Sequence, residues 1–351
     1  MIRRKALVSC AAAPVLVSLG ACVVGGGNPG KGQVTSTRGS GHLIFGNDGN
    51  IQIMGGDGSG RKALTKVPQG GLAKDPAWSP DGKLIAFSFS PPLPAVRGPG
   101  GMLPLPVTDV HVIAASGVHQ KTLIAHEAPG VGYESPVWAP DGKTLYLTYT
   151  ELVVESNIVR DQVVEVARVP PGAGPRETLI PNGAFQAVSS DGKLLACIVA
   201  TREGQAILIS GVDGRNPRAL VPAGQMEGLT SPRFSPDGKQ LAFSAIAPSA
   251  PVPVPTTPAR RSQGPLETLF ATRVASAHGL PMDVYVVATD GGAPNRLTTL
   301  GEDNPSVAWS SDGNRLAILA GGGIYIAGAR GESLVNLDPK GGHGRLDWKL
   351  G

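Results

Sequence analysis

Cysteine, aromatic residues and charged residues are all scarce in this sequence. The chain has 3 cysteines among 351 residues, 5% of its residues are aromatic and 17% are charged. Cys10 and Cys22 lie in an N-terminal segment that we expect to be cleaved or modified, which leaves Cys197 as the free thiol of the mature chain. No internal disulfide can then form. Cys197 lies in an apolar run, where a buried cysteine behaves as a small hydrophobic residue rather than as a nucleophile.

A strong positive field is also missing. The formal net charge is +4, and Arg3, Arg4 and Lys5 of the N-terminal segment supply three of these charges. The rest of the chain is therefore close to neutral, and we expect no nucleic-acid-binding surface.

The signatures of several enzyme classes are absent from the sequence. It contains no long amphipathic segment of helical period, no G-x-S-x-G nucleophile motif and no α/β region that could carry a peptidase triad. The glycine runs at 25–27 and 321–323 lack the Lys-Ser/Thr pair of a phosphate-binding loop. We therefore expect no catalytic residues and no cofactor.

The sequence instead contains one stretch five times, at 77–90, 137–150, 187–200, 233–246 and 308–321. Its clearest copy reads AWSPDGKLIAFSFS, and its fifth and sixth positions are always Asp and Gly. Self-similarity at a period of roughly 40 to 50 residues is typical of a solenoid or a propeller. The Asp-Gly pairs are Asp81 and Gly82, Asp141 and Gly142, Asp191 and Gly192, Asp237 and Gly238, and Asp312 and Gly313.

Each copy has the composition of a β-hairpin. Asp-Gly between two apolar runs favours a tight turn, because glycine accepts positive φ and aspartate bonds the neighbouring backbone. The run after the turn (84–89 in the first copy) is apolar on both faces, so both faces must be covered. Sheets stacked radially as blades provide that cover without helices. An aromatic residue precedes most of the turns: Trp78, Trp138, Phe234 and Trp309, with Val188 and Ser189 in the third copy.

The two ends of the chain complete one further blade. Segments 42–45, 50–54 and 61–65 have the character of the second, third and fourth strands of a blade that lacks its first strand. Residues 345–350, which contain Trp348, match the aromatic strand that precedes each Asp-Gly turn. We therefore predict an all-β, six-bladed β-propeller over 42–351, closed by one C-terminal strand and three N-terminal strands, with no open sheet edge at the closure.

The repeat resembles that of the TolB-type β-propeller family. The W-S-P-D-G-K core followed by I-A-F carries the resemblance, which covers roughly residues 42–351. It implies a propeller fold. The chain departs from the family pattern in two ways: a short linker stands where TolB has an α/β domain, and a lipoprotein motif precedes that linker.

Residues 1–22 resemble a bacterial lipoprotein signal. Arg3, Arg4 and Lys5 form a positive start, 6–19 are apolar, and Leu-Gly-Ala-Cys follows at 19–22 as in a lipobox. The resemblance implies a signal peptide at 1–21, cleavage between Ala21 and Cys22, and acyl chains on Cys22 that anchor the protein in a membrane. Alternatives are an ordinary secretory signal and, from the arginine pair, a twin-arginine route. Residues 22–41 are rich in glycine and serine and form a flexible tether.

Two insertions, at 90–108 and 247–280, interrupt the repeat between the second and third strands of their blades. We expect both on the face of the ring opposite the Asp-Gly turns. They are either solvated Pro-rich flaps or a lid or partner platform over the central channel. A short helix over 266–277 and a basic spot at Arg260 and Arg261 are further expectations for the second insertion.

Candidate ligand-binding side chains are few. The Asp-Gly carboxylates are expected to be structural, because a ring spaces them too far apart for paired acid–base catalysis. The histidines show no H-x-x-x-H spacing, and only His126 beside Glu127 and His343 fall in links near the channel mouth. We expect no metal site.

The sequence favours a non-enzymatic role. We expect a monomeric, extracytoplasmic, lipid-anchored scaffold that binds a protein, peptide or glycan partner at the bacterial cell envelope. The alternative is a propeller hydrolase or lactonase with a metal in its central channel, which would need several acidic, amide or histidine side chains on the axis. A fold alone does not name the ligand.

Overall fold

The computed structural model describes residues 41–92, 95–98, 101–104, 107–155, 158–170, 175–247 and 280–349. The expected signal peptide, Cys22, nearly all of the tether, the 266–277 helix and the pair Arg260 and Arg261 lie outside these residues. Among the described residues, no helix has the length and hydropathy needed to span a membrane.

The described chain folds into six four-stranded antiparallel sheets and one additional hairpin. Three blades follow the N-terminal strands: β4 (Leu72–Trp78), β5 (Leu84–Ser90), β8 (Asp109–Ala114) and β9 (Lys121–Ile124); β10 (Val131–Trp138), β11 (Leu145–Glu155), β12 (Ile158–Val169) and β13 (Glu177–Pro181); β14 (Gly183–Val188), β15 (Leu194–Thr201), β16 (Gly204–Gly211) and β17 (Arg218–Val221).

Two further blades come from the C-terminal third, and the sixth joins both chain ends. They are β18 (Thr230–Phe234), β19 (Gln240–Ile246), β20 (Met282–Ala288) and β21 (Asn295–Arg296); β22 (Ser306–Trp309), β23 (Arg315–Ala320), β24 (Gly323–Gly328) and β25 (Val335–Asp338); and the closing blade of β26 (His343–Lys349), β1 (His42–Asn47), β2 (Asn50–Gly55) and β3 (Lys62–Ala63).

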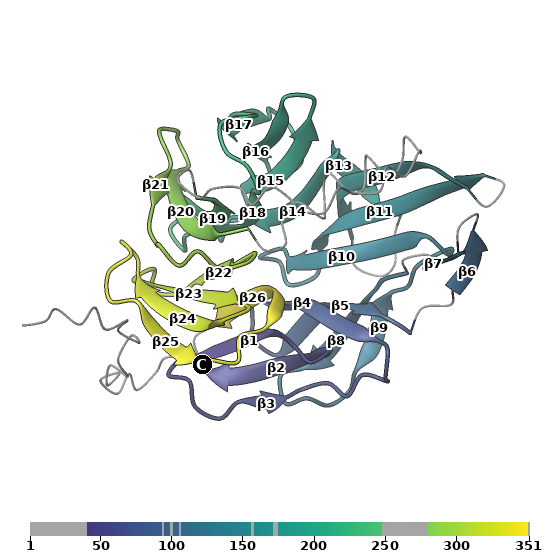
Figure 1. The fold of residues 1–351 in the computed structure, drawn as a ribbon, viewed down its shortest axis with the longest axis horizontal. Helices are drawn as coiled ribbons and strands as arrows, with labels where there is room; N and C mark the ends of the chain where they lie inside the picture. The colour runs from purple at the N-terminus through teal and green to yellow at the C-terminus, as the bar shows by residue number, and fades with distance from the viewer. Residues whose placement is uncertain are drawn as a thin grey trace, which may run out of the picture. The chain divides into compact units, whose positions relative to one another are not determined.

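The six sheets form a ring (Figure 1). Its centre is built from the first strand of each blade, in the order β4, β10, β14, β18, β22 and β26, and each of these strands contacts the next, with β26 returning to β4. The six-bladed β-propeller predicted from the repeat is therefore confirmed.

The closing blade pairs the two ends of the chain as the sequence predicts. Strand β26 lies antiparallel to β1, with His42 opposite Lys349 and Leu43 opposite Trp348. Strands β1, β2 and β3 then follow in order. The terminal tryptophan segment therefore supplies the missing first strand.

Neighbouring blades pack against each other through the two apolar faces of their strands. In β1, Leu43 and Phe45 are buried with Leu319 of the preceding blade, whereas Ile44 between them is buried with Ile85 and Phe87 of the following blade. Alternate side chains point to opposite faces of a strand, so a strand between two sheets must be apolar throughout. This explains the continuous apolar runs of the repeat.

The Asp-Gly turns are closed by side chains as well as by backbone. In the first turn, Oγ of Ser79 and the backbone N–H of Lys83 both donate to Oδ1 of Asp81, at 2.7 and 3.1 Å. Gly82 has φ of 70° and its N–H donates to the carbonyl of Ser79. Equivalent Ser–Asp contacts occur at Asp191, Asp237 and Asp312, and Thr144 takes this role at Asp141. The turns span more residues than the two-residue hairpin that Asp-Gly alone suggests, because the serine is part of the closure.

Both insertions begin and end at the strand ends opposite these turns. The first contains a hairpin of β6 (Ala95–Gly98) and β7 (Gly101–Pro104). Residues 248–279 of the second insertion lie outside the described residues. One extension was not predicted: β11 and β12 run for 11 and 12 residues, and their hairpin projects beyond the other blades (Figure 1).

Candidate functional site

Five of the six innermost strands are interrupted at the same level of the ring. The pairing register shifts at 75–76 in β4, 135–136 in β10, 185–186 in β14, 231–232 in β18 and 344–346 in β26. Strand β22 pairs with β23 without a shift. A bulge redirects side chains that would otherwise alternate between sheet faces. The first bulged residues all have φ between 51° and 72°: Asp75, Ser135, Phe185, Ser231 and Gly344.

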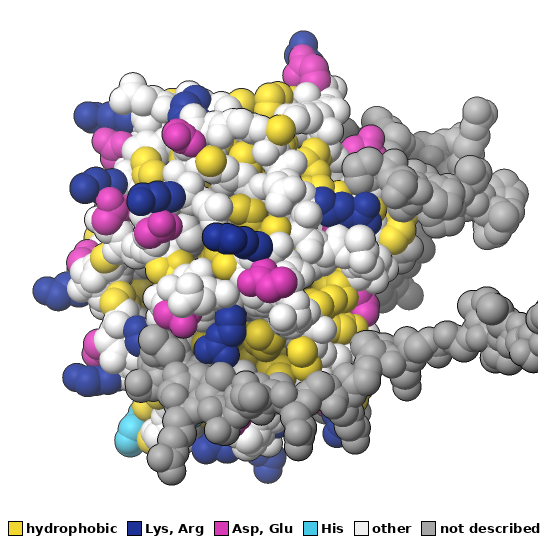
Figure 2. Space-filling model, turned by 90° about the vertical axis from the view of Figure 1, so that its left-hand side faces the viewer, with side chains coloured by type: hydrophobic (Ala, Val, Ile, Leu, Met, Phe, Trp, Pro, Cys, Tyr) yellow, Lys and Arg dark blue, Asp and Glu magenta, His cyan; other side chains and the backbone are white. Residues whose placement is uncertain are grey.

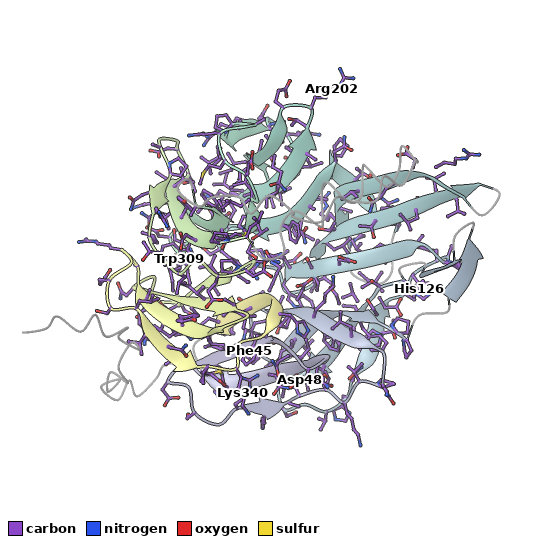
Figure 3. All side chains as sticks on the ribbon, viewed as in Figure 1. Phe45, Asp48, His126, Arg202, Trp309 and Lys340 are labelled. Atoms are coloured by element: carbon purple, nitrogen blue, oxygen red, sulfur yellow. The ribbon has the colours of Figure 1, made fainter. Side chains whose placement is uncertain are left out.

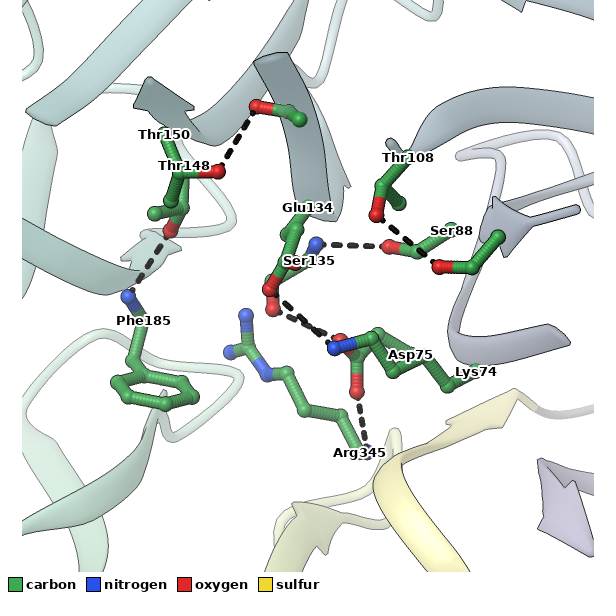
Figure 4. A network of polar contacts seen from close by, with 12 residues as sticks. Lys74, Asp75, Ser88, Thr108, Glu134, Ser135, Thr148, Thr150, Phe185 and Arg345 are labelled. Atoms are coloured by element: carbon green, nitrogen blue, oxygen red, sulfur yellow. Dashed lines mark hydrogen bonds and ion pairs between the residues drawn. The ribbon is translucent and has the colours of Figure 1, made fainter. Parts of the chain in front are cut away.

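These bulges place a network of polar contacts on the ring axis (Figure 4). Asp75 is buried, and its two carboxylate oxygens accept from the backbone N–H of Arg345 at 2.8 Å and from Oγ of Ser135 at 2.9 Å. The backbone N–H of Ser135 donates to Oγ of Ser88 at 2.9 Å. One carboxylate therefore joins β4 to the strands on both sides, β26 and β10.

The network continues through a buried amide. Nε2 of Gln186 donates to the carbonyls of Ser135 and Tyr146, and its Oε1 accepts from Oγ1 of Thr148 at 2.9 Å. Thr148 also accepts from the backbone N–H of Phe185 at 3.2 Å. The open backbone positions that the bulges create are thus satisfied by side chains from neighbouring blades.

Two arginines, one from β18 and one from β26, also reach the axis. Nη2 of Arg345 donates to the carbonyl of Pro232 at 3.3 Å, and Nη2 of Arg233 donates to the carbonyl of Leu346 at 3.0 Å. Burial lowers the pKa of both guanidiniums, and the neighbouring charge of Arg233 lowers the pKa of Arg345 further. Strands β18 and β26 are therefore linked by two crossed arginine side chains.

An axial funnel opens on the Asp-Gly side of this network. It is a cavity of about 430 Å³ that every innermost strand helps to line. Arg233 and Asp347 line this cavity. The rest of its wall includes the residue at the aromatic position of each innermost strand: Trp78, Trp138, Val188, Phe234, Trp309 and Trp348.

Indole N–H groups join the funnel wall to the preceding blade. Nε1 of Trp138 donates to the carbonyl of Ala77 at 3.3 Å, and Nε1 of Trp309 donates to the carbonyl of Arg233 at 3.2 Å. Oδ2 of Asp347 accepts from the backbone N–H of Trp78 at 2.8 Å. The aromatic positions of the repeat thus line the funnel and also hold neighbouring innermost strands together. Figure 3 labels one of them, Trp309.

The two candidate histidines are not brought together by the fold. His126 follows β9, and its backbone N–H and Nδ1 both contact Oδ1 of Asp109, at 2.7 and 2.6 Å (Figure 3). Glu127 accepts from the hydroxyl of Tyr133. His343 begins β26, where burial lowers the pKa of its imidazole. Among the described residues, no three His, Cys, Asp or Glu side chains are grouped so that they could hold a metal ion.

The Asp-Gly carboxylates lie one per turn around the rim of the ring. The hydrogen bond from Ser79 lowers the pKa of Asp81, and the equivalent serines do the same for Asp191, Asp237 and Asp312. Cys197 is buried in the core of its blade, and burial raises the pKa of its thiol to about 12.

Sequence reasoning missed the charged residues on the axis. It named no charged residue there, whereas Asp75 and Arg345 are buried in the polar network and Arg233 lines the funnel. A signal was available, since each is a charged residue inside an innermost strand: Asp75 and Arg345 lie three residues before the aromatic position, and Arg233 lies directly before it. The bulges, which have no marker in the sequence, contain Asp75 and Arg345, whereas Arg233 lies just after the bulge of its strand, opposite Ala242.

No protein-family model matches the chain. Among curated proteins, it is 27% identical over 178 residues to an uncharacterized peptidase, YuxL of Bacillus subtilis strain 168. The match covers 49% of this chain and 21% of that protein. The chain therefore spans about a fifth of the length of this relative.

The solved structures identify the fold. TolB from Acinetobacter baumannii superposes with a TM-score of 0.60 at 17% identity, over 88% of this chain and 66% of that one. A putative TolB from Agrobacterium tumefaciens gives 0.56 at 16% identity, over 87% and 91%. The fold is the TolB-type propeller.

This TolB-like fold also occurs within an enzyme. A puromycin-hydrolyzing peptidase of Mycobacterium tuberculosis superposes with a TM-score of 0.51 at 15% identity, over 88% of this chain and 44% of that one. At these identities the likeness extends to the fold.

Proposed function

We propose that this protein is a lipid-anchored envelope protein whose TolB-like propeller binds a protein partner at the axial funnel without catalysing a reaction. The observation that carries the proposal is the funnel itself. All six innermost strands contribute to one concave surface with an aromatic wall. The few residues that dominate the binding energy of protein interfaces are enriched in tryptophan and arginine, and both residue types line this cavity.

The envelope location is supported by the N-terminal sequence. The lipobox-like segment 19–22 implies acylation at Cys22, and a TolB-type propeller agrees with a protein that works outside the cytoplasm. In the proposed mature protein, the lipid holds the propeller at the membrane and segment 22–41 allows it to reach a partner.

Site-specific photo-cross-linking tests the proposed surface. Ser190 is exposed and lines the funnel, so a benzoyl-phenylalanine at this position would contact whatever occupies the cavity. The matched control is the same probe at Arg202, which is exposed at the outer rim, at the end of a strand in the same sheet (Figure 3). We expect a discrete cross-linked protein from position 190 in intact cells and none from position 202.

The outcome separates the two faces of the ring. A protein adduct at 190 that survives deletion of 247–280 supports the funnel as the docking surface. Loss of the adduct on deletion would assign docking to the opposite face, and equal labelling from both positions would contradict a specific partner. Transfer of label to a glycan instead of a protein would change the partner class.

An enzymatic role is the second candidate, because an uncharacterized peptidase matches about half of the chain in sequence and a solved peptidase structure contains the same fold. Incubation of the purified full chain with a fluorophosphonate probe tests for a serine nucleophile, and metal analysis tests the alternative of a channel metal. Stoichiometric labelling or stoichiometric metal would replace the binding proposal with a hydrolase.

A further inference from the structure

Arg233 and Arg345 form an unusual feature of the axis. Arg345 is 3% exposed, and Arg233 lies against it from β18. Each guanidinium reaches across to a backbone carbonyl beside the other arginine, as described above. Two positive charges are therefore held side by side, with Arg345 buried in the ring and Arg233 half-buried at the wall of the funnel.

Several of their N–H groups have no acceptor. Nε and Nη1 of Arg345 and Nε of Arg233 are buried, and none of the three makes a hydrogen bond within the described residues. Figure 4 shows the side chain of Arg345 beside Asp75 in the polar network on the axis. Buried guanidinium nitrogens are normally paired, since an unpaired buried donor loses its hydration without replacement.

The nearby carboxylates are engaged elsewhere. Asp75 accepts from the backbone of Arg345 and from Ser135, and Asp347 accepts from the backbone of Trp78. Within the described residues, neither carboxylate forms a hydrogen bond or ion pair with either guanidinium. The protein thus supplies countercharge nearby but leaves Nε and Nη1 of Arg345 and Nε of Arg233 without an acceptor among the described residues.

Burial of these charges has a cost that a ligand would remove. A guanidinium stays protonated at all ordinary pH values, so it cannot escape burial by losing its proton. An isolated buried charge is strongly unfavourable, and a second like charge beside it adds repulsion.

We propose that Arg233 and Arg345 hold a small oxyanion on the propeller axis, a carboxylate or a phosphate. The guanidinium fork matches the two oxygens of such groups and forms short, charge-assisted hydrogen bonds with them. Arg233 also lines the funnel, which gives an anion a route from solvent to the site. This inference stands independently of the proposed partner, because a free anion can bind whether or not a protein docks.

Thermal unfolding of the purified full chain in detergent is the first test. Formate, phosphate and chloride are titrated at constant pH and ionic strength, with the bulky MES anion as the balance. We expect formate or phosphate to raise the unfolding midpoint saturably, by about 2 °C or more, and chloride to do so less. Preference for formate identifies a carboxylate ligand, and preference for phosphate identifies a phosphate ligand.

Variants locate the site by calorimetric titration of the better anion. Arg233→Gln should weaken its binding by about tenfold or more, because a charge-assisted hydrogen bond is lost. Arg233→Lys keeps the charge without the fork and should fall between the two. Arg202→Gln removes an exposed arginine from the rim and should bind as the wild type does.

Clear results would overturn the proposal. No saturable stabilisation of the wild type by either oxyanion would mean that water alone occupies the space, and a response to chloride alone would exclude an oxyanion site. Equal loss of binding in Arg202→Gln would indicate a surface charge effect. Arg345→Gln provides a second variant, and if it does not fold, the wild-type titrations and Arg233→Gln decide the question.

Discussion

The closing blade and the β22–β25 blade beside it are alike in sheet order but differ in connectivity. Both have four antiparallel strands with a tryptophan on the first strand, Trp348 or Trp309. An Asp-Gly turn joins β22 to β23, whereas β26 and β1 come from opposite ends of the chain. The entropic cost of closing the loop between such distant segments is larger than that of closing a hairpin. The closing blade therefore depends on packing and hydrogen bonds alone, and it is where we expect the ring to open first.

Trp348→Ala should produce the largest effect. The indole is 5% exposed, packs with Leu43 and Phe45, and lies under the guanidinium of Arg315 at 5.0 Å. Its removal leaves a cavity that should lower the free energy of unfolding by about 3–5 kcal/mol. Urea denaturation measures this loss.

Trp309→Ala is the matched control, because Trp309 is 7% exposed at the equivalent position of a covalently continuous blade. Both variants should lose stability, but Trp348→Ala should accelerate unfolding more. Equal unfolding rates would mean that the closing blade is no weaker than its neighbour.

Asp75→Ala should have the next largest effect, because Asp75 ties the closing strand to the following blade. Its loss leaves the N–H of Arg345 and the hydroxyl of Ser135 without their acceptor in a buried site. We expect a loss of about 2–3 kcal/mol in the free energy of unfolding.

Ser135→Ala removes only one of these two contacts and spares the closing strand, so it should cost less than Asp75→Ala. If Ser135→Ala lowers the free energy of unfolding as much as Asp75→Ala does, the contact between β4 and β10 accounts for the contribution of Asp75, and the contact with the closing strand adds little.

Asp312→Ala makes the β22–β23 turn more like the closing blade, which has no such turn. It removes the acceptor for Oγ of Ser310 and the N–H of Asn314, and we expect a loss of about 0.5–1 kcal/mol. Ser310→Ala should reproduce part of the loss.

The same carboxylate predicts a dependence on pH. The hydrogen bond from Ser310 holds the folded-state pKa of Asp312 below its usual 3.8. Its contribution is therefore complete above the unfolded-state value and is lost as the pH falls through the lower folded-state pKa. Wild type and Asp312→Ala should converge in stability at acid pH, and a constant difference down to pH 2 would contradict this.

The smallest effect is expected at Cys197, which lies far from both chain ends in sequence. Because burial raises the pKa of its thiol to about 12, it should not react with iodoacetamide at neutral pH while the ring is closed. Mass spectrometry of the tryptic peptide should show labelling only in denaturant. Rapid labelling of the native protein would mean that its blade opens locally, before the closing blade does.

The sequence was sufficient for the blade count and the closure, because the Asp-Gly repeat and the aromatic position recur with the spacing of the strands. Trp348 could be placed opposite the first strands for the same reason. The axial chemistry could not be predicted, since the bulge that contains Arg345 has no marker in the sequence, and Arg233 takes a position that holds alanine or valine in β4, β10, β14 and β22. The contact between His126 and Asp109 could not be predicted either, because the pairing of β8 with β9 brings the two residues together.

The start of β1 beside the end of β26 has a consequence for how the propeller can be used. His42 shares a cavity with Asp81, Gly82 and Lys349, and Nζ of Lys349 donates to the carbonyl of Pro80 on the funnel rim. The chain therefore enters the ring on the side where the funnel opens. If Cys22 is acylated as proposed, the tether joins the ring on the same side as the proposed binding surface. The length of the tether then limits the size of a partner that can bind between the funnel and the membrane. Shortening the tether would exclude large partners while leaving the ring intact.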